Sequence, residues 1–413
     1  MLQGAYFINV RGKRQSRAGR VDTPRRRSIA VLIEFARGYG WGLLSGVAQF
    51  VREHHEVSVQ TEEWRWTDAI PAWFRNWTGD GVIAWVETDE LAEVIRQLGV
   101  PAVDVRGCVA GAGLPVVGAN NRAVAKLAAE HLISRQFRNY AYAGSAGANY
   151  SDIRSQWFQE ELKQAGFLCG VYQLPGMSRE IQALEPEKRD SFFESHFDEW
   201  LKTLPKPVGI MACNDIRGQQ IINACHRVNL AVPEEVAVVG VDNDPIFCHL
   251  CDPPLSSVEL DAAGAGYQAA VLLERLIQGQ KAPAERIEVP PVGVVARRST
   301  DILATNDREL AAGARFLHER AFSRITTLDM ARAAGMSRRV FERRFAALFG
   351  RSPKAEVLRL RMERVKELLL HTDWTLAEIA EQTGFKHSEY LHAVCSQKLG
   401  LSPGEFRRRG KTQ

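Results

Sequence analysis

The chain has 413 residues, of which 45% are hydrophobic and 25% are charged, and its formal net charge is +4. This length exceeds the roughly 250–300 residues that one hydrophobic core supports, so two or three domains are expected, and the composition excludes a disordered or collagen-like chain. The sequence has no run of about 18 apolar residues that would predict a membrane-spanning helix. Seven cysteines without a secretory signal predict reduced thiols in a cytoplasmic protein.

The charge is distributed unevenly along the chain. Residues 1–27 carry eight basic residues and one acidic residue, residues 307–413 carry 21 and 13, and the middle carries 24 and 35. The net charges of the two ends are therefore +7 and +8, and the net charge of the middle is −11. A basic end on an acidic body predicts that the end contacts a polyanion, unless the asymmetry is only that of solvated faces.

Residues 1–27 show neither helical periodicity nor turn signals, although Arg11–Arg20 and Arg25–Arg27 make them strongly basic. We therefore expect a disordered tail rather than a helix–turn–helix unit. Such a tail can contact DNA phosphates but does not need to, and a start codon assigned too far upstream is the alternative.

Residues 28–298 alternate between short apolar segments and longer segments that suit helices. The predicted strands are Ile29–Phe35, Gly81–Val86, Ala102–Val105, Tyr140–Ala143, Val208–Ala212 and Val236–Val241. The predicted helices are Trp41–Glu53, Arg122–Arg135, Ser151–Ala165, Asp215–Val228 and Asp261–Gln278. Apolar strands separated by helices form parallel sheets that are covered on both faces. The segment is long enough for two doubly wound lobes, with a ligand cleft beyond the carboxyl ends of the strands.

Polar side chains follow several of these strands. Carboxylates, amides and guanidinium groups can each pair with two neighbouring hydroxyls, so their presence at strand ends predicts a polyhydroxylated ligand. Trp41, Trp85 and Trp157 offer platforms for the apolar face of a sugar ring. Asp and Asn also cap helices after strands, which is the structural alternative for each of them. The polar residues at these strand ends are Asn120, Asn121, Arg154, Asn214, Asp215, Arg217, Asp242, Asn243 and Asp244.

The last hundred residues contain an internal repeat. Ala331-x3-Gly335 and Ala380-x3-Gly384 lie 49 residues apart, and each leads to a Gly-x-Ser-Pro sequence, at 350–353 and at 400–403. Glycine readily takes the left-handed conformation of a tight turn between helices. The repeat therefore predicts two helix–turn–helix units.

Capping signals mark where the helices of these units begin. Thr375-x-x-Glu378 is a capping box, and Thr326-x-x-Asp329 is a weaker version of it. Ser352 followed by Pro353 starts a helix that connects the two units. The apolar stripe that we expect this helix to bury is Ala355, Leu358, Met362, Val365 and Leu369.

The second helix of each unit carries residues that suit DNA. Arginine binds guanine bidentately and neutralises phosphate, and glutamate accepts a hydrogen bond from cytosine. An arginine-rich helix alone is more often a solvated face, but the repeat, the caps and the charge of +8 together favour DNA binding. The predicted DNA-binding residues are Ser337, Arg338, Arg339, Glu342, Arg343, His387, Ser388, Glu389 and His392.

Two parts of the chain resemble known families. The stretches LDMARAAGMSRRVFERRFAALFGRSP and LAEIAEQTGFKHSEYLHAVCSQKLGLSPGEFRRR resemble the DNA-binding domain of the AraC family of bacterial transcription regulators. The stretches GANNRAVAKLAAEHLISRQFRNYAYAG and GIMACNDIRGQQIINACHRVNLAVPEEVAVVGVDND resemble the sugar-binding body shared by LacI-type repressors and periplasmic binding proteins. By that second resemblance, the residues that match positions often touching the effector are Asn121, Arg154, Asn214, Asp215 and Asp242. Together with Arg217, two residues after Asp215, they are the predicted ligand-binding residues.

The resemblance implies a fold and a division into domains. A two-lobed, periplasmic-binding-protein-like α/β body with doubly wound parallel sheets would occupy residues 28–298. A linker at 299–306 would join it to an all-α domain with two helix–turn–helix units at 307–413.

This order of domains, together with VPPVGVVARRSTD, resembles AraC-type regulators that respond to xylose. The resemblance implies a homodimeric activator of a sugar catabolic operon, controlled by a monosaccharide. D-xylose is the expected effector, and another sugar or a small polar ligand is the alternative. Double-stranded DNA would be its partner and RNA polymerase a possible further one, with no membrane involved.

Two other classes of function fit the sequence less well. A sugar-acting enzyme would need a catalytic motif, and the sequence contains no Gly-x-Ser-x-Gly elbow, Walker loop or metal motif. A transport-binding protein would need an export signal. Cys248-x2-Cys251 with His249 has no second ligand pair of the kind that structural zinc requires. We therefore predict no enzymatic activity, no cofactor and no metal.

Overall fold

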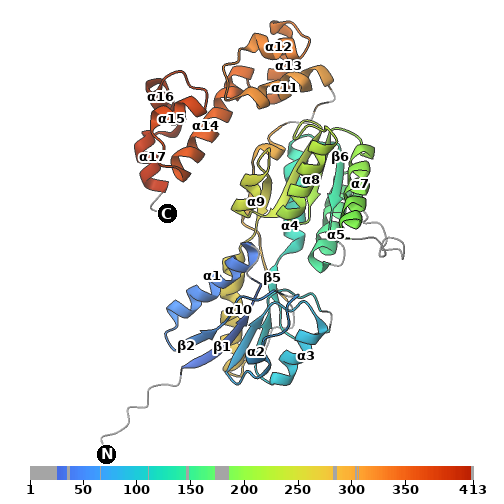
Figure 1. The fold of residues 1–413 in the computed structure, drawn as a ribbon, viewed down its shortest axis with the longest axis vertical. Coiled ribbons are helices and arrows are strands. Elements are labelled where there is room, and N and C mark those ends of the chain that lie inside the picture. Colours follow the sequence, from blue (N-terminus) through green and yellow to red (C-terminus); the bar gives the residue numbers. More distant parts are fainter. Residues whose placement is uncertain are drawn as a thin grey trace, which may run out of the picture.

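The computed structural model describes residues 26–34, 38–65, 67–109, 111–145, 148–172, 186–281, 286–302, 305 and 307–410. Two α/β lobes and a helical domain follow one another along the longest axis of the molecule (Figure 1). The tail predicted at residues 1–27 lies outside the described residues except for Arg26 and Arg27, and Arg27 already begins the first strand. No helix in the described part of the chain is long and apolar enough to cross a membrane.

The N-terminal lobe contains a parallel four-stranded sheet in the order β2-β1-β3-β4. Its strands are β1 (Arg27–Leu32), β2 (Val57–Gln60), β3 (Gly81–Ala84) and β4 (Ala102–Asp104). Its helices are α1 (Gly38–Glu53), α2 (Ala72–Arg75), α3 (Asp89–Leu98) and α10 (Ala262–Ile277). Every residue of β3 and most of β1 are buried, as expected for central parallel strands covered on both faces. The strands and the first helix predicted for this lobe are confirmed.

Helices α1 and α10 come from distant parts of the chain and lie against each other in this lobe (Figure 1). A Cβ on Gly46 would lie 1.9 Å from the carbonyl oxygen of Ala263, and a Cβ on Gly266 would lie 1.9 Å from that of Leu43. Only glycine fits at these two positions, because the helix backbones approach each other directly.

The C-terminal lobe contains a six-stranded sheet in the order β12-β10-β9-β8-β6-β7, in which only the β10–β12 pair is antiparallel among the described strands. Its strands are β6 (Asn139–Ala143), β7 (Cys169–Tyr172), β8 (Val208–Ala212), β9 (Val236–Asp242), β10 (Ser256–Glu259) and β12 (Gly293–Val295). Its helices are α4 (Asn121–Ser134), α5 (Asn149–Gln164), α7 (Pro186–Thr203), α8 (Asp215–Arg227) and α9 (Pro245–Leu250). These bounds confirm the predicted α/β alternation.

The chain passes between the lobes after β5 (Val117–Ala119), after β10 and after β11 (Ile287–Val289). β5 and β11 pair in parallel with each other as a small separate sheet. The two lobes are therefore joined by neighbouring strands rather than by a single linker, which lets them move as units about one region.

The C-terminal domain is entirely helical in its described residues. Its helices are α11 (Arg308–Arg320), α12 (Thr327–Ala333), α13 (Arg338–Phe349), α14 (Pro353–His371), α15 (Leu376–Gln382), α16 (Ser388–Leu399) and α17 (Pro403–Gly410). Both predicted capping boxes are present, and Ser352 caps α14 with Pro353 at its first turn. The turn glycines Gly335 and Gly384 have φ of 63° and 74°, which confirms the left-handed turns.

The stripe predicted for the connecting helix α14 is only partly correct. Met362, Val365 and Leu369 are buried against the second unit, as predicted, but Ala355 is exposed. The reason is that α14 packs against both units, with a different side of the helix facing each. Its first half instead buries Val357, and the neighbouring Leu360, against the first unit.

The C-terminal lobe and the helical domain share a buried junction. Ser299 and Thr300, predicted to lie in a linker, are fully buried in the lobe, where Ser299 Oγ accepts a hydrogen bond from Ser256 N at 2.8 Å. Next to them, His318 Nδ1 of α11 lies 3.1 Å from Glu234 Oε1 of the lobe. The helical domain is therefore held directly against the lobe.

Candidate functional site

A cavity lies between the two lobes, beyond the carboxyl ends of their strands. The cavity is narrow, with a volume of about 40 Å³, and several polar groups converge on it, as is typical of ligand sites. Both lobes contribute to its walls. The lining residues are Tyr39, Trp85, Val105, Arg106, Gly118, Ala119, Asn121, Asn149, Tyr150, Ile153, Arg154, Asn214, Asp242, Leu260 and Arg286.

Arg154 is at the centre of the polar wall that the C-terminal lobe provides. It projects from α5, and only 4% of the residue is exposed. Its Nε donates to Asn121 Oδ1 at 2.9 Å, and its Nη1 donates to the carbonyl oxygen of Cys213. Its guanidinium carbon lies 4.9 Å from the centre of the Tyr150 ring. These contacts fix the guanidinium in one position at the edge of the cavity.

Asn214 continues this wall from the end of β8. Its Oδ1 caps α8 by accepting a hydrogen bond from Arg217 N at 2.9 Å, while its Nδ2 donates to Tyr150 Oη at 3.0 Å. Asn214 therefore does both things that the sequence allowed, since it caps a helix and also lines the cavity.

Arg106 spans the cavity from the N-terminal lobe. Its guanidinium carbon lies 4.5 Å from the ring centre of Trp85 in its own lobe and 4.4 Å from that of Tyr150 in the other. Burial alone would lower the pKa of Arg106, but Glu87, 3.1 Å away, acts together with Cys108 and Tyr150 to raise it. The backbone of this segment is held by Asp104, which accepts hydrogen bonds from Arg106 N at 2.7 Å and Gly107 N at 2.9 Å.

Asp242 ends β9 and lines the cavity in a strained backbone conformation. Its φ is 112°, and that of Asn243 is 54°; such conformations cost about 1 kcal/mol or more in residues other than glycine. The loop is held in place because Asn243 N donates to Ser257 Oγ at 3.0 Å and Asp244 N donates to Asp215 Oδ2 at 2.7 Å. The strain therefore coincides with the position that carries the only acidic residue among the described lining residues.

Asp215 and Arg217, both predicted to bind ligand, do not line the cavity. Asp215 is 98% buried behind it, and its other oxygen accepts from Ser257 Oγ at 2.6 Å. Burial, with the nearby charge of Asp242, raises the pKa of Asp215 to about 8. Arg217 lies toward α7, with its guanidinium 5.9 Å from the Phe197 ring. Asp215 therefore lies behind the cavity wall in this structure and holds the loop that carries Asp242.

Of the three tryptophans predicted to contact a sugar ring, one lines the cavity and two do not. Trp85 lines the cavity, whereas Trp41 is 61% exposed and Trp157 stacks on the guanidinium of Arg122 at 4.2 Å. The lining residues that we did not predict are Tyr39, Val105, Arg106, Gly118, Ala119, Asn149, Tyr150, Ile153, Leu260 and Arg286. Arg106 directly follows a predicted strand, so the strand-end rule could have found it.

The helical domain presents a second candidate surface on α13. Ser337, Arg338, Arg339 and Arg343 are exposed, while Glu342 is half-buried and pairs with Arg338, with Arg338 Nε 2.9 Å from Glu342 Oε1. Ser337 is the N-cap of this helix and accepts a hydrogen bond from Val340 N at 3.4 Å. With Arg344, which pairs with Asp307, four arginines are therefore exposed along this short helix.

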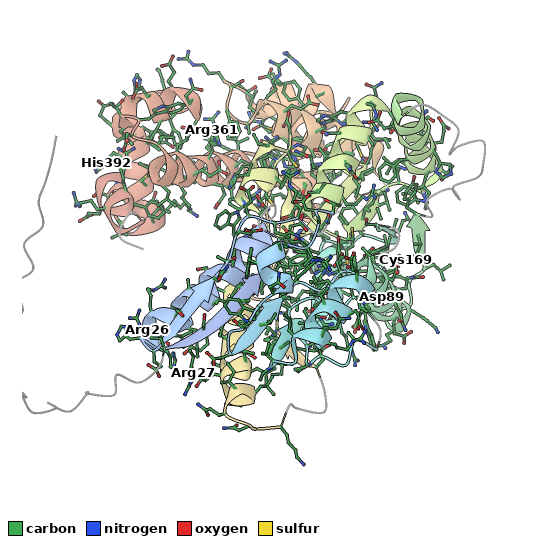
Figure 2. The ribbon with its side chains drawn as sticks, turned by 60° about the horizontal axis from the view of Figure 1, so that its bottom comes forward. Arg26, Arg27, Asp89, Cys169, Arg361 and His392 are labelled. Atoms are coloured by element: carbon green, nitrogen blue, oxygen red, sulfur yellow. The ribbon has the colours of Figure 1, made fainter. Side chains whose placement is uncertain are left out.

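The matching helix of the second unit, α16, is less basic. His387, Glu389 and His392 are exposed, and Ser388 is half-buried. His387 is the N-cap residue but makes no side-chain capping bond. His392 lies at the outer margin of the domain (Figure 2). A groove between the two units is lined by Arg338, Lys354 and Arg361 among others, so basic side chains connect the two helices.

Two families match separate parts of the chain. The periplasmic binding protein-like domain matches residues 129–300, and a helix-turn-helix domain matches residues 330–409. The xylose operon regulatory protein of Escherichia coli (strain K12) is 28% identical over 398 residues, which is 93% of this chain and 97% of that protein. The corresponding protein of Haemophilus influenzae is 28% identical over 92% of this chain and 97% of its own.

Solved structures agree with this picture. The structure of a xylose-binding transcription activator aligns with a TM-score of 0.76 and 28% identity, covering 93% of this chain and 98% of that one. A LacI-type regulator from a Rhodococcus species shares the fold of the body, with a TM-score of 0.55 over 68% of this chain. Residues 129–300 therefore match a periplasmic binding protein-like domain and residues 330–409 a helix-turn-helix domain, and over nearly its whole length the chain is similar to transcription regulators rather than to enzymes.

Proposed function

We propose that this protein is a DNA-binding transcription regulator controlled by a monosaccharide that binds between its lobes, with D-xylose as the first effector to test. The observation that carries the proposal is one chain that joins a polar inter-lobe cavity to two helix–turn–helix units. Xylose is supported because the chain is similar to a xylose operon regulatory protein and to a xylose-binding transcription activator. Another sugar or small polar ligand is the alternative.

The ligand would be held by Asn121, Arg154, Asn214 and Asp242. These side chains offer amide, guanidinium and carboxylate groups to neighbouring hydroxyls, and Trp85 offers an apolar surface for the ring. Buried hydrogen-bonding groups of this kind discriminate strongly against ligands that leave them unpaired. The set therefore supports a polyhydroxylated ligand over an apolar one.

The loop Asp242–Asp244 gives the cavity a direct route to the DNA-binding domain. Asp244 is the N-cap of α9, whose His249 Nδ1 lies 3.6 Å from Glu367 Oε1 of α14. On the other side, Gly38 of the N-terminal lobe abuts the same loop, since a Cβ there would lie 2.7 Å from Asp244 Oδ2. A ligand that binds the closed lobes more tightly would thereby favour one placement of α9 against α14.

On DNA, α13 and α16 would enter successive major grooves, about 34 Å apart. Closure of the lobes would favour a homodimer in which four such helices meet the operator, with activation of transcription through RNA polymerase. The accessible arginines of α13 support base contacts by the first unit.

Substitution of Arg343 by alanine tests the base contacts. Arg343 is exposed on α13, and the substitution should weaken binding to the selected operator by about 1–3 kcal/mol if the side chain reads a base. The measurement is a titration with operator and with random-sequence duplex at fixed salt. An equal loss on both duplexes would assign Arg343 to a phosphate instead.

The experiment that tests the proposed function is thermal unfolding of the full chain with a panel of aldoses and ketoses. A sugar at 100 times its dissociation constant should add about 2.7 kcal/mol to the stability of the body. A shift with D-xylose alone supports that effector, and a shift with another sugar replaces it. If no sugar shifts the transition, the effector class is wrong.

A further inference from the structure

Arg361 occupies a central position in the DNA-binding domain, midway along α14, the helix that connects the two units (Figure 2). Its Nε donates to the carbonyl oxygen of Ala321 and its Nη2 to that of Ser323, each at 2.7 Å. Both acceptors belong to the first unit, directly after α11. Its Nη1 donates at 2.7 Å to the carbonyl oxygen of Gly384, in the turn of the second unit. One guanidinium thus bonds to both units from the helix between them.

These carbonyl oxygens lie at or just beyond the C-terminal ends of helices, where a positive charge is stabilising. Ala321 is the C-cap residue of α11, and Gly384 follows the C-cap residue of α15. The last carbonyls of a helix have no partner within it, and they carry the negative end of the helix dipole. Arg361 therefore satisfies a carbonyl at the end of α11 and a carbonyl in the turn after α15, and among the described residues no carboxylate forms an ion pair with it.

The two units also touch each other directly at this point. Gly384 has φ of 74°, and a Cβ on it would lie 2.5 Å from the carbonyl oxygen of Phe322. The guanidinium lies 6.0 Å from the ring centre of Phe385, the next residue. The turn of the second unit thus packs against residues 321–323 of the first unit. Arg361 donates hydrogen bonds to the turn and to these residues.

We propose that Arg361 is a positioning residue that fixes the two helix–turn–helix units at the separation and angle at which both can contact DNA together. The proposal rests on the proposed two-groove mode of DNA binding. Rigidly linked units bind a complete site far more tightly than either does alone, by about 10²–10⁴-fold, and lose this gain when their geometry is wrong. Lysine cannot replace arginine here, because a single ammonium cannot point along three fixed directions as a planar guanidinium does.

The test uses the full chain and a duplex that the native protein selects from a randomised library. Three probes are compared: the complete duplex, and two duplexes in which the bases under one or the other unit are scrambled. We expect Arg361→Met and Arg361→Lys to lose about tenfold or more on the complete duplex. Both should bind the two scrambled duplexes within about twofold of the native protein, because each unit is intact.

Arg364→Met is the matched control. Arg364 lies one turn further along α14 and pairs only with Glu367 among the described residues, so its loss removes the same charge without touching either unit. This control should bind all three duplexes nearly as the native protein does.

An equal loss by the Arg361 variants on all three duplexes would overturn the proposal, because it would indicate a phosphate contact or a damaged unit. If the native protein itself binds the scrambled duplexes as tightly as the complete one, the two-groove mode fails, and the role of Arg361 fails with it.

Discussion

Replacing Arg154 by alanine is expected to abolish the response to the effector. Arg154 is 96% buried at the cavity wall and donates to Asn121 Oδ1 and to the Cys213 carbonyl. Truncating one partner of a buried, charged hydrogen bond costs about 2–5 kcal/mol, so the effector should bind at least about 30-fold more weakly. Calorimetric titration of the sugar identified by thermal unfolding measures this loss directly.

The control for this substitution is Arg138→Ala in the same lobe. Arg138 is exposed and lies 5.6 Å from the Phe167 ring, so its removal should leave sugar affinity unchanged. Arg154→Ala should also lower the stability of the ligand-free body by about 1–3 kcal/mol, because two buried acceptors lose their donor. Native sugar affinity in Arg154→Ala would show that the sugar binds outside this cavity.

Replacing Glu356 by alanine is expected to destabilise the junction between the body and the DNA-binding domain by about 1–3 kcal/mol. Glu356 of α14 is 99% buried. Arg359 Nη2 lies 2.6 Å from Glu356 Oε1 and also bonds to Asp301, and Arg351 bonds to Glu356 from the other side. Removing Glu356 leaves Arg351 and Arg359 without their shared carboxylate, but both arginines are partly exposed and Arg359 keeps Asp301, so the loss is smaller than for a fully buried pair. Denaturant unfolding of the variant measures the loss.

The same network predicts a dependence on pH. Burial alone would raise the pKa of Glu356, but the hydrogen bond and charge of Arg359, with the charges of Arg351 and His318, outweigh it and lower the pKa. A carboxyl whose pKa is lower in the folded state stabilises the protein above its unfolded pKa of about 4.3. This contribution is lost as the pH falls through the folded pKa.

Glu356→Gln should therefore lose stability relative to the native chain near neutral pH, and the difference should shrink in acid. Glu363→Gln, at an exposed position of the same helix that pairs with Lys366, is the control and should change little. A pH-independent difference between Glu356→Gln and the native chain would contradict the assignment of this charge.

The strands and helices of the body were predictable because their signals are local. Val208–Ala212 is apolar throughout and matches β8 residue for residue, as a parallel strand buried on both faces requires. The capping boxes at Thr326 and Thr375 located the first helix of each unit, since capping depends on residues three apart.

The cavity was predictable only in part, because its residues come together through the tertiary fold. Asn214 and Asp242 follow their strands and line the cavity, but Asp215, next to Asn214, points behind it to Ser257. Sequence cannot distinguish these neighbours, because the direction of each side chain depends on the loop after β9. Arg286 was missed for a similar reason: β11 returns to pair with β5 after more than 160 residues.

The packing of α14 on two sides could not be predicted either, because it also depends on the tertiary fold. A single apolar stripe is the expectation for a helix with one partner, whereas α14 buries Val357 against the first unit and Val365 against the second. Arg361 lies between these two halves, and nothing in its local sequence distinguishes it from the exposed Arg364.

The central claim is that a sugar bound between the lobes changes how tightly the same chain binds DNA. The most direct measurement is the affinity of the native protein and of Arg154→Ala for the selected duplex, with and without D-xylose and each sugar of the panel. We predict that one sugar changes the DNA affinity of the native protein by about 5–150-fold, and that Arg154→Ala shows no such change. If no sugar that binds the protein changes its affinity for DNA, the central claim is contradicted.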